Sequence, residues 1–195
     1  MTDLNEAIAL KEWAVAVDAL TEGKQILVLR KGGIAEETRD FRLVSPRFYL
    51  LPAYEHQKPE LLKEEHRGGI SRTLERWDPQ AGTVQLRAYA EAVDDIEIHD
   101  QTKLDKIREY HIWTDTFAEE RLRWRRTKPL HLLLLRVGIL ANPIEIPMRE
   151  AYSGCKSWVQ IEEGVSMPET RPVLEDQEFN ARVNEIRSAL KVMKV

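Results

Sequence analysis

The sequence predicts an α+β fold in which a mixed or mainly antiparallel sheet is accompanied by an N-terminal and a C-terminal amphipathic helix. Three observations support this class. Apolar residues recur at spacings of three and four near both ends, apolar or alternating runs occupy the middle, and strands and helices do not alternate regularly. With 195 residues, 43% hydrophobic and 32% charged, the chain is expected to form one domain, 1–195, in which residues 168–195 are a C-terminal connector and helix.

The N-terminal third is predicted to contain one helix and then strands. A helix is predicted over 6–20 because four apolar residues share one helical face: Leu10, Trp13, Ala14 and Val17. The run KQILVLR predicts a strand at 24–30. Residues 41–52, FRLVSPRFYLLP, indicate two short strand pieces interrupted at Ser45–Pro46. Because proline cannot donate to a strand ladder, a sheet edge or a bulge is expected there.

The middle third combines a charged segment with a long strand. A proline at the first turn predicts a short helix over 59–65, which Gly68–Gly69 is expected to end. Residues 83–99 alternate between apolar and polar side chains, as in a long strand with one exposed face, although the alanines leave a helix open over 87–93. Short helices are predicted over 102–109 and 115–127.

The last third begins with a strongly apolar strand over 130–140. The prolines of NPIEIPM, residues 142–148, predict an edge or a loop. SWVQI, residues 157–161, predicts another strand, and MPETRP, residues 167–172, a connector. The final helix is predicted from one apolar face: Phe179, Val183, Ile186 and Leu190.

Charge and cysteine content narrow the classes of protein. The 29 Lys and Arg against 33 Asp and Glu give a net charge of -4, so attraction of the whole surface to phosphate backbones is not expected, while a local basic patch remains open. The single cysteine, Cys155, rules out an intramolecular disulfide and fits a reducing compartment. The N-terminal segment does not resemble a signal peptide, and the apolar run at 130–140 is too short to span a bilayer. We therefore expect a cytoplasmic protein outside the membrane, and no motif identifies a cofactor.

The polar residues that follow the strand at 47–53 are the first candidates for a catalytic site. Tyr54, Glu55 and His56 combine a hydroxyl, a carboxylate and an imidazole, the groups that acid–base chemistry uses. Lys156 is a fourth candidate, because a cation beside the thiol of Cys155 can activate it as a nucleophile. The alternative is the polar end of an edge strand and an inert thiol, since no base for the cysteine is identifiable.

Two basic segments are candidates for binding nucleic acid or phosphate. LRKGGI, residues 29–34, places two cations and two glycines after a strand, where backbone N–H groups can hold a phosphate. RLRWRRTK, residues 121–128, is the only dense basic stretch and contains a tryptophan able to stack on a base. The alternatives are a plain turn and a helix C-terminus stabilised by cations. The candidate residues are Arg30, Lys31, Arg47, Arg121, Trp124, Arg125, Lys128 and Arg136.

A weaker candidate is a metal site on the long strand. Asp95, Glu97 and His99 alternate on one strand face, a spacing from which two carboxylates and an imidazole can reach one cation. A solvated strand face explains the same residues. A metal-dependent nuclease of the restriction type is disfavoured, because its Glu-x-Lys element is matched only by Glu22-Gly23-Lys24 at a predicted turn.

Six separated segments carry a resemblance to a known family: LKEWAVAVDAL, ILVLRKGGI, PRFYLLPAYEHQ, HIWT, LLLLRVGIL and YSGCKSWVQI. In this order, over nearly the whole chain, they resemble the uncharacterised bacterial family named domain of unknown function 1802. The resemblance implies an association with restriction-modification machinery, since some members are fused to or associated with a restriction-endonuclease-like domain. It supplies no established site residues.

Three functions are therefore expected. The leading hypothesis is a cytoplasmic accessory module that binds nucleic acid or a nucleic-acid enzyme through its local basic clusters. The second is a hydrolase or other small-substrate enzyme with a site around Tyr54, His56 and Lys156. The third is a non-catalytic interaction or oligomerisation module that exposes an apolar face of the C-terminal helix. Residue patterns leave the oligomeric state open.

Overall fold

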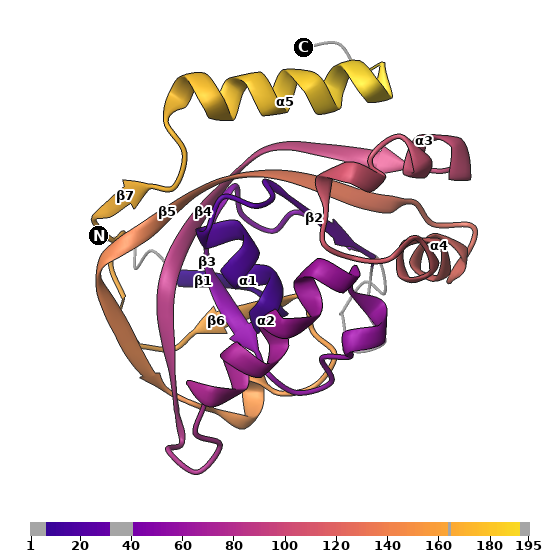
Figure 1. Cartoon of the computed structure of the whole chain (residues 1–195). Coiled ribbons are helices and arrows are strands. Elements are labelled where there is room, and N and C mark those ends of the chain that lie inside the picture. Colours follow the sequence, from indigo (N-terminus) through magenta and orange to yellow (C-terminus); the bar gives the residue numbers. More distant parts are fainter. Residues whose placement is uncertain (1–6, 32–40, 164, 192–195) are drawn as a thin grey trace.

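The computed structural model describes residues 7–31, 41–163 and 165–191 and has the predicted α+β architecture (Figure 1). In this part of the chain a mixed sheet of seven strands has the order β2-β5-β4-β3-β1-β6, with β7 paired to β5 outside this path. The strands are β1 (Ala7–Trp13), β2 (Leu27–Arg30), β3 (Arg47–Ala53), β4 (Thr83–Ile98), β5 (Leu130–Pro147), β6 (Trp158–Ile161) and β7 (Thr170–Pro172). The α-helices are α1 (Ala14–Thr21), α2 (Glu64–Glu75), α3 (Gln101–Asp105), α4 (Asp115–Arg123) and α5 (Asp176–Leu190).

The N-terminal segment forms strand β1 before helix α1, so the prediction of one helix over 6–20 is wrong for its first half. Strand β1 pairs with β3 in parallel and with β6 in antiparallel orientation, which places Leu10 opposite Leu50 on one side and Trp158 on the other. Pairing on both sides outweighs the helical spacing of the apolar residues. Helix α1 begins only at Ala14.

Strand β3 lies between β1 and β4, so the prediction of an edge or a bulge within 41–52 is wrong for most of the strand. The ladder between β3 and β4 runs from Arg47 to Tyr49, while β1 pairs with β3 as far as Ala53. Pro52 therefore lies where the strand pairs on one side only. A missing N–H is tolerated at such a position.

Strands β4 and β5 form a long antiparallel pair, called here the β4–β5 hairpin although α3 and α4 lie in its connection, that starts with Thr83 opposite Pro147 and ends with Ile98 opposite Leu130. The long strand predicted over 83–99 is confirmed. The edge predicted at 142–148 is confirmed among the described residues, because β5 pairs there with β4 on one side only, while β2 and β7 on its other side reach no further than Leu134 and Leu140. The connector predicted at 167–172 contains the short strand β7, which pairs with β5.

Helix α2 continues through Gly68–Gly69, which were predicted to end it. A Cβ atom on Gly69 would lie 2.8 Å from Cγ2 of Val15 in α1, so a residue without a side chain lets the two helices pack closely. The helix predicted over 59–65 is instead a 3-10 turn at Pro59–Leu61 followed by α2. The close packing of α1 against α2 therefore explains why residue 69 is a glycine, and Gly69 does not end the helix.

The two short helices of the middle segment end earlier than predicted. Helix α3 is followed by a separate 3-10 turn at Arg108–Tyr110. Helix α4 begins after Thr114, whose hydroxyl accepts a hydrogen bond from the backbone N–H of Phe117 at 3.2 Å, and it ends at Arg123. Within the described ranges, none of the helices combines the length and the hydrophobicity needed to cross a membrane.

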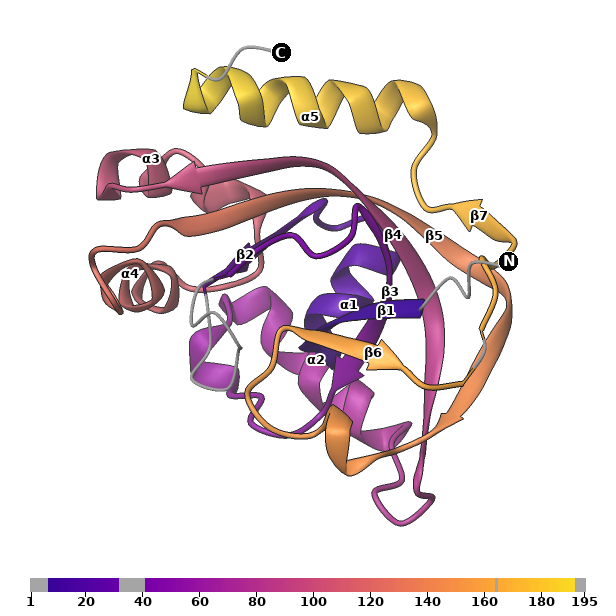
Figure 2. The same cartoon turned by 180° about the vertical axis from the view of Figure 1, so that it is seen from behind.

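Helix α5 covers the outer face of the β4–β5 hairpin, while α1 and α2 lie on the opposite side (Figures 1 and 2). Its predicted apolar face is confirmed as buried: Phe179, Val183, Ile186 and Leu190. The side chain of Arg187 donates to the carboxylate of Asp94 on β4 at 2.8 Å. The apolar face of α5 therefore packs within the chain.

Candidate functional site

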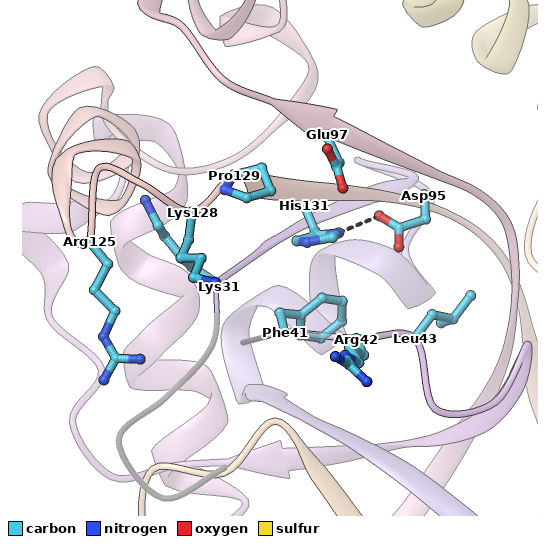
Figure 3. Close-up of a pocket in the computed structure, with 10 residues that line it drawn as sticks. All are labelled: Lys31, Phe41, Arg42, Leu43, Asp95, Glu97, Arg125, Lys128, Pro129 and His131. Carbon is cyan, nitrogen blue, oxygen red and sulfur yellow. Dashed lines mark hydrogen bonds and ion pairs between the residues drawn. The ribbon is translucent and has the colours of Figure 1, made fainter. Parts of the chain in front are cut away.

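A pocket of about 470 Å³ lies beside the end of β2 (Figure 3). Its polar lining combines four cations, two carboxylates and an imidazole: Lys31, Arg42, Arg125, Lys128, Asp95, Glu97 and His131. Its apolar lining consists of Phe41, Leu43 and Pro129. The pocket brings together residues that the sequence assigned to a phosphate site and to a separate metal site: Lys31, Arg125, Lys128, Asp95 and Glu97.

Strand pairing explains why these distant residues meet. Strand β5 lies between β2 and β4, and His131 on β5 is opposite Arg30 on one side and Glu97 on the other. Directly opposed residues of antiparallel strands point their side chains to the same face of a sheet. The three side chains therefore form a row across three strands, and the imidazole of this row enters the pocket.

His131 is held in place by a carboxylate and an aromatic ring. Its Nδ1 lies 2.8 Å from Oδ1 of Asp95, which is two residues from Glu97 on β4 (Figure 3). The imidazole packs against Phe41 with ring centroids 5.2 Å apart. The side chains of His131 and Asp95 are 13% and 25% exposed, so both remain accessible at the pocket wall. A carboxylate that fixes an imidazole is the arrangement that acid–base catalysts use.

Phe41 and Arg42 form the wall that faces β6. The ring of Phe41 stacks on Trp158 with centroids 5.9 Å apart. The indole Nε1 of Trp158 donates a hydrogen bond to the carbonyl oxygen of Arg42 at 2.7 Å. The side chain of Arg42 is exposed while Phe41 is buried. Strand β6 thus fixes the backbone from which the arginine extends.

Lys31 follows β2 directly and reaches the end of α4. Its Nζ donates to the carbonyl oxygen of Leu122 at 2.6 Å, and the residue is only 6% exposed. Burial lowers the pKa of Lys31, because removing the ammonium from water disfavours its charge. The two glycines that follow it in the predicted phosphate loop lie outside the described residues.

A tight turn after α4 presents two further cations to the pocket. The backbone N–H of Lys128 donates to the carbonyl oxygen of Arg125 at 2.9 Å and closes the turn, with Arg125 in the left-handed region at a φ of 50°. The guanidinium of Arg125 lies 4.6 Å from the ring centre of Trp124, which is 41% exposed. Arg125 and Lys128 both line the pocket.

Arg30 points into the core instead of the pocket lining. Its Nη1 donates to the carboxylate of Glu12 at 3.1 Å and its Nη2 to the hydroxyl of Ser157 at 2.6 Å. Within the described part of the chain, Arg30 and Glu12 are 8% and 4% exposed, and Nε of Arg30 is buried without a hydrogen-bond partner. Strands β2 and β6 stand at the two ends of the strand order and do not pair with each other. The ion pair joins Arg30 of β2 to Glu12 of β1, the strand next to β6, and so connects the two ends of the sheet.

Arg121 is half-buried and also packs against the core. Its guanidinium lies 4.6 Å from the ring centre of Phe117, and Nη1 donates to the carbonyl oxygen of Leu29 at 3.4 Å. Desolvation of the guanidinium and the nearby charge of Arg30 lower the pKa of Arg121 to about 10, while Glu12 opposes both effects. These contacts give Arg121 a structural role between α4 and β2.

Arg47 and Arg136 lie away from the pocket. Arg47 forms an ion pair with Glu91 on β4 at 3.6 Å. Arg136 forms an ion pair with Asp176 at the start of α5, and its guanidinium lies 4.2 Å from the ring centre of Phe179. The structure therefore does not join these two arginines to the cations at 125–128.

Tyr54 and His56 lie at the end of β3, beside α2. The ring of Tyr54 stacks on Trp77 with centroids 5.1 Å apart and an angle of 3° between the planes. Burial raises the pKa of Tyr54, and the neighbouring Arg87 opposes this effect. His56 is exposed and has a positive φ of 65°, which turns the chain out of the strand.

Glu55 and Lys156 are found near a third polar side chain, that of Lys11 on β1. Nζ of Lys11 donates to two backbone carbonyl oxygens within 152–154, both at 2.9 Å. Burial lowers the pKa of Lys11, and the negative charge of Glu55 opposes this effect. Nζ of Lys156 donates to the carbonyl oxygen of Ala151 at 3.1 Å. Lys11 and Lys156 therefore stabilise the 150–156 segment through hydrogen bonds to its backbone carbonyl oxygens.

The predicted metal candidates are divided between two pairs. Asp95 binds His131, whereas Nε2 of His99 lies 2.9 Å from Oε2 of Glu97. Across residues 7–31, 41–163 and 165–191, no group of three or more His, Cys, Asp or Glu side chains is arranged to hold a metal ion.

Sequence reasoning missed His131, Phe41 and Arg42. A signal for His131 was present, since it is the one imidazole in the apolar run at 130–140. Its partner Asp95 could not be paired with it without the register of β4 and β5. Phe41 and Arg42 precede β3 in a segment without regular secondary structure, so the strand piece predicted before Ser45–Pro46 is wrong.

Comparison with known proteins places the chain in a family. No functionally curated protein matches it. Among solved structures, a point mutant of the ASCH protein of Zymomonas mobilis is 11% identical, with a TM-score of 0.48 over 82% of this chain and 90% of that chain. The unmutated ASCH protein is also 11% identical, with a TM-score of 0.48 over 81% of this chain and 89% of that chain. The model of the family described as "Domain of unknown function (DUF1802)" matches residues 9–185, and the chain therefore belongs to this family, as the six sequence segments predicted.

Proposed function

We propose that the chain binds an unpaired segment of a nucleic-acid strand, with a backbone phosphate held in the pocket. The observation that carries the proposal is the pocket lining, in which, among the residues that the structure describes, four cations stand against two carboxylates. This local excess of positive charge contrasts with the net charge of -4 for the whole chain. A concave, partly desolvated surface strengthens the attraction between such cations and a phosphate.

The surroundings of the pocket fit a strand better than a duplex. Trp124 is exposed beside the turn that carries Arg125 and Lys128, and a base can stack on its indole without regard to sequence. The volume of about 470 Å³ is within the range of sites that enclose one small ligand, such as a single nucleotide. A paired base would first have to leave its stack to enter.

Fluorescence anisotropy with labelled single-stranded and duplex oligonucleotides tests the proposal. We expect single strands to bind more tightly, with an affinity that falls between about 50 and 200 mM salt. Lys128→Glu should weaken binding at least about tenfold, because it reverses a charge at the pocket. Arg171→Glu is the matched control, since it makes the same charge change on the exposed strand β7. Absence of salt-dependent binding at micromolar protein contradicts the proposal.

A second candidate function is supported by the hydrogen bond between His131 and Asp95. An imidazole held by a carboxylate in a cationic pocket is suited to proton transfer during hydrolysis of an anionic ester. The small-substrate alternative proposed around Tyr54, His56 and Lys156 thereby gains a second location. The assay is the release of nitrophenol from bis(p-nitrophenyl) phosphate. Loss of this activity in His131→Gln but not in His56→Gln would support a catalytic site at the pocket. The opposite pattern would favour the original residues.

The remaining alternatives concern partners. The family resemblance implies an association with restriction-modification machinery in the cytoplasm, so a DNA-processing enzyme is the protein partner we propose. Co-purification of the chain with the products of neighbouring genes tests this. The oligomerisation alternative loses the exposed apolar helix face it required, because the apolar residues of α5 are buried within the chain.

A further inference from the structure

We infer that the pocket prefers guanine among the nucleobases and that the carboxylate of Glu97 recognises it; the inference rests on the proposed function. Most of the charges in the pocket are separated in space, as Figure 3 shows: three cations lie to one side of His131 (Arg125, Lys31, Lys128) and the carboxylates to the other (Asp95, Glu97), while Arg42 lies between Phe41 and Leu43. A ligand that suits this arrangement is negative at one end and carries hydrogen-bond donors at the other.

The two carboxylates retain the capacity to accept hydrogen bonds. Oδ1 of Asp95 is engaged by His131, and Oε2 of Glu97 by His99. An ionised carboxylate has about four acceptor positions, so each keeps free positions after one contact. The Glu97 side chain is 55% exposed and that of Asp95 is 25% exposed. Glu97 is therefore the more accessible of the two, while Asp95 chiefly positions the imidazole.

Guanine matches this acceptor better than the other bases. Its Watson–Crick edge offers the N1–H and N2–H donors side by side, which can bind one carboxylate through two parallel hydrogen bonds. Adenine and cytosine offer one amino group, and uracil offers one N–H between two carbonyl oxygens that a carboxylate repels. With the phosphate beside the cations, a guanine nucleotide places its donors at the opposite end of the pocket.

Labelled uridine heptanucleotides with one central substitution test the inference. We expect a central guanosine to bind about tenfold more tightly than a central uridine, with adenosine and cytidine between them, since one good bidentate contact discriminates by about that factor. Glu97→Gln should abolish the guanosine preference, so that the guanosine strand binds no more tightly than the all-uridine strand. Glu145→Gln is the matched control, because it makes the same change near the opposite end of the β4–β5 hairpin.

The outcomes separate this inference from the proposed function. Equal, salt-dependent affinity for all four heptanucleotides overturns the guanine preference and leaves strand binding intact. A guanosine preference that survives in Glu97→Gln overturns the role of this carboxylate. Failure of every strand to bind overturns both. Far-ultraviolet circular dichroism of Glu97→Gln confirms that the variant is folded.

Discussion

Nζ of Lys31 lies 2.6 Å from the carbonyl oxygen of Leu122, so the residue that follows β2 is tied to the end of α4. The reverse contact runs from Arg121 of α4 to the carbonyl oxygen of Leu29 in β2. These two contacts set the distance between the strand end and the turn at 125–128. They connect the packing of the core to the position of the pocket cations.

Lys31→Met separates the binding role of the ammonium from its structural role. Methionine keeps most of the side-chain volume and removes both the buried charge and the bond to Leu122, two changes with opposite effects on stability. We expect the free energy of unfolding in urea to change by less than about 1 kcal/mol, because these effects offset each other. Oligonucleotide affinity should fall about tenfold, since one of the cations that line the pocket is lost. A loss of stability above about 3 kcal/mol with unchanged affinity would make Lys31 purely structural.

His111 makes the fold sensitive to acid. The residue is 4% exposed and its Nδ1 has no hydrogen-bond partner within the described ranges. Burial lowers its pKa to about 4, with the charge of Lys63 acting in the same direction. Because the unfolded chain then binds a proton more tightly, stability is full above about pH 6.5 and declines as the pH falls toward 4.

Urea unfolding at pH 7 and pH 4.5 measures this decline. For this one group we expect a loss of about 2 kcal/mol between the two pH values. In His111→Gln that part of the loss should disappear, because glutamine does not titrate. His99→Gln provides the control, since His99 is exposed. If both variants retain the wild-type pH dependence, His111 is not the responsible group.

Much of the fold could be predicted from local patterns, and the exceptions share a cause. The alternation in β4 and the apolar stripe of α5 are properties of single segments. The spacing of apolar residues predicts a helix where strand β1 lies, because the identity of this strand depends on distant partners: Ala9 pairs with Tyr49 on one side and Val159 on the other. Such pairing leaves no trace in the periodicity of the segment itself.

The site could be predicted only in pieces for the same reason. Asp95 and Glu97 appeared as a metal candidate, and Arg125 and Lys128 as a phosphate candidate. The register of β4 and β5 sets Glu97 opposite His131. The carboxylates of β4 and the cations at 125–128 therefore line the same pocket. Sequence spacing likewise cannot tell a cation that packs on the core from one that lines a pocket: Arg121 lies over the ring of Phe117, whereas Arg125 lines the pocket.

Two adjacent glycines in α2 should respond oppositely to alanine. Gly68→Ala meets nothing within 4 Å and should raise the free energy of unfolding by about 0.5–1 kcal/mol, because alanine favours a helix. Gly69→Ala would place its Cβ 2.8 Å from Cγ2 of Val15 and should lower it by about 1–3 kcal/mol. Urea denaturation of both variants measures the difference. Equal effects would show that α1 and α2 can move apart without cost.

The buried pair of Glu12 and Arg30 should reveal itself through non-additive substitutions. Glu12→Gln leaves the guanidiniums of Arg30 and Arg121 without their carboxylate, which should cost about 3 kcal/mol. Adding Arg30→Met removes one uncompensated cation and should restore part of this loss. Thermal or urea unfolding of the two single variants and the double variant gives the coupling. Purely additive losses would mean that the pair contributes no net interaction.

Helix α5 provides the test of whether residues 1–195 form one domain. Its Phe179 is 3% exposed and lies under the guanidinium of Arg136 on β5, so Phe179→Ala should cost about 3–4 kcal/mol. Asn184→Ala, on the exposed side of the same helix, should change stability by less than about 0.5 kcal/mol. In one cooperative domain the first variant lowers the midpoint of a single transition, because the core beneath α5 cannot remain packed once the helix detaches. If the variant instead shows an early unfolding transition followed by an unchanged main transition, residues 168–195 unfold separately and the sheet is stable without them.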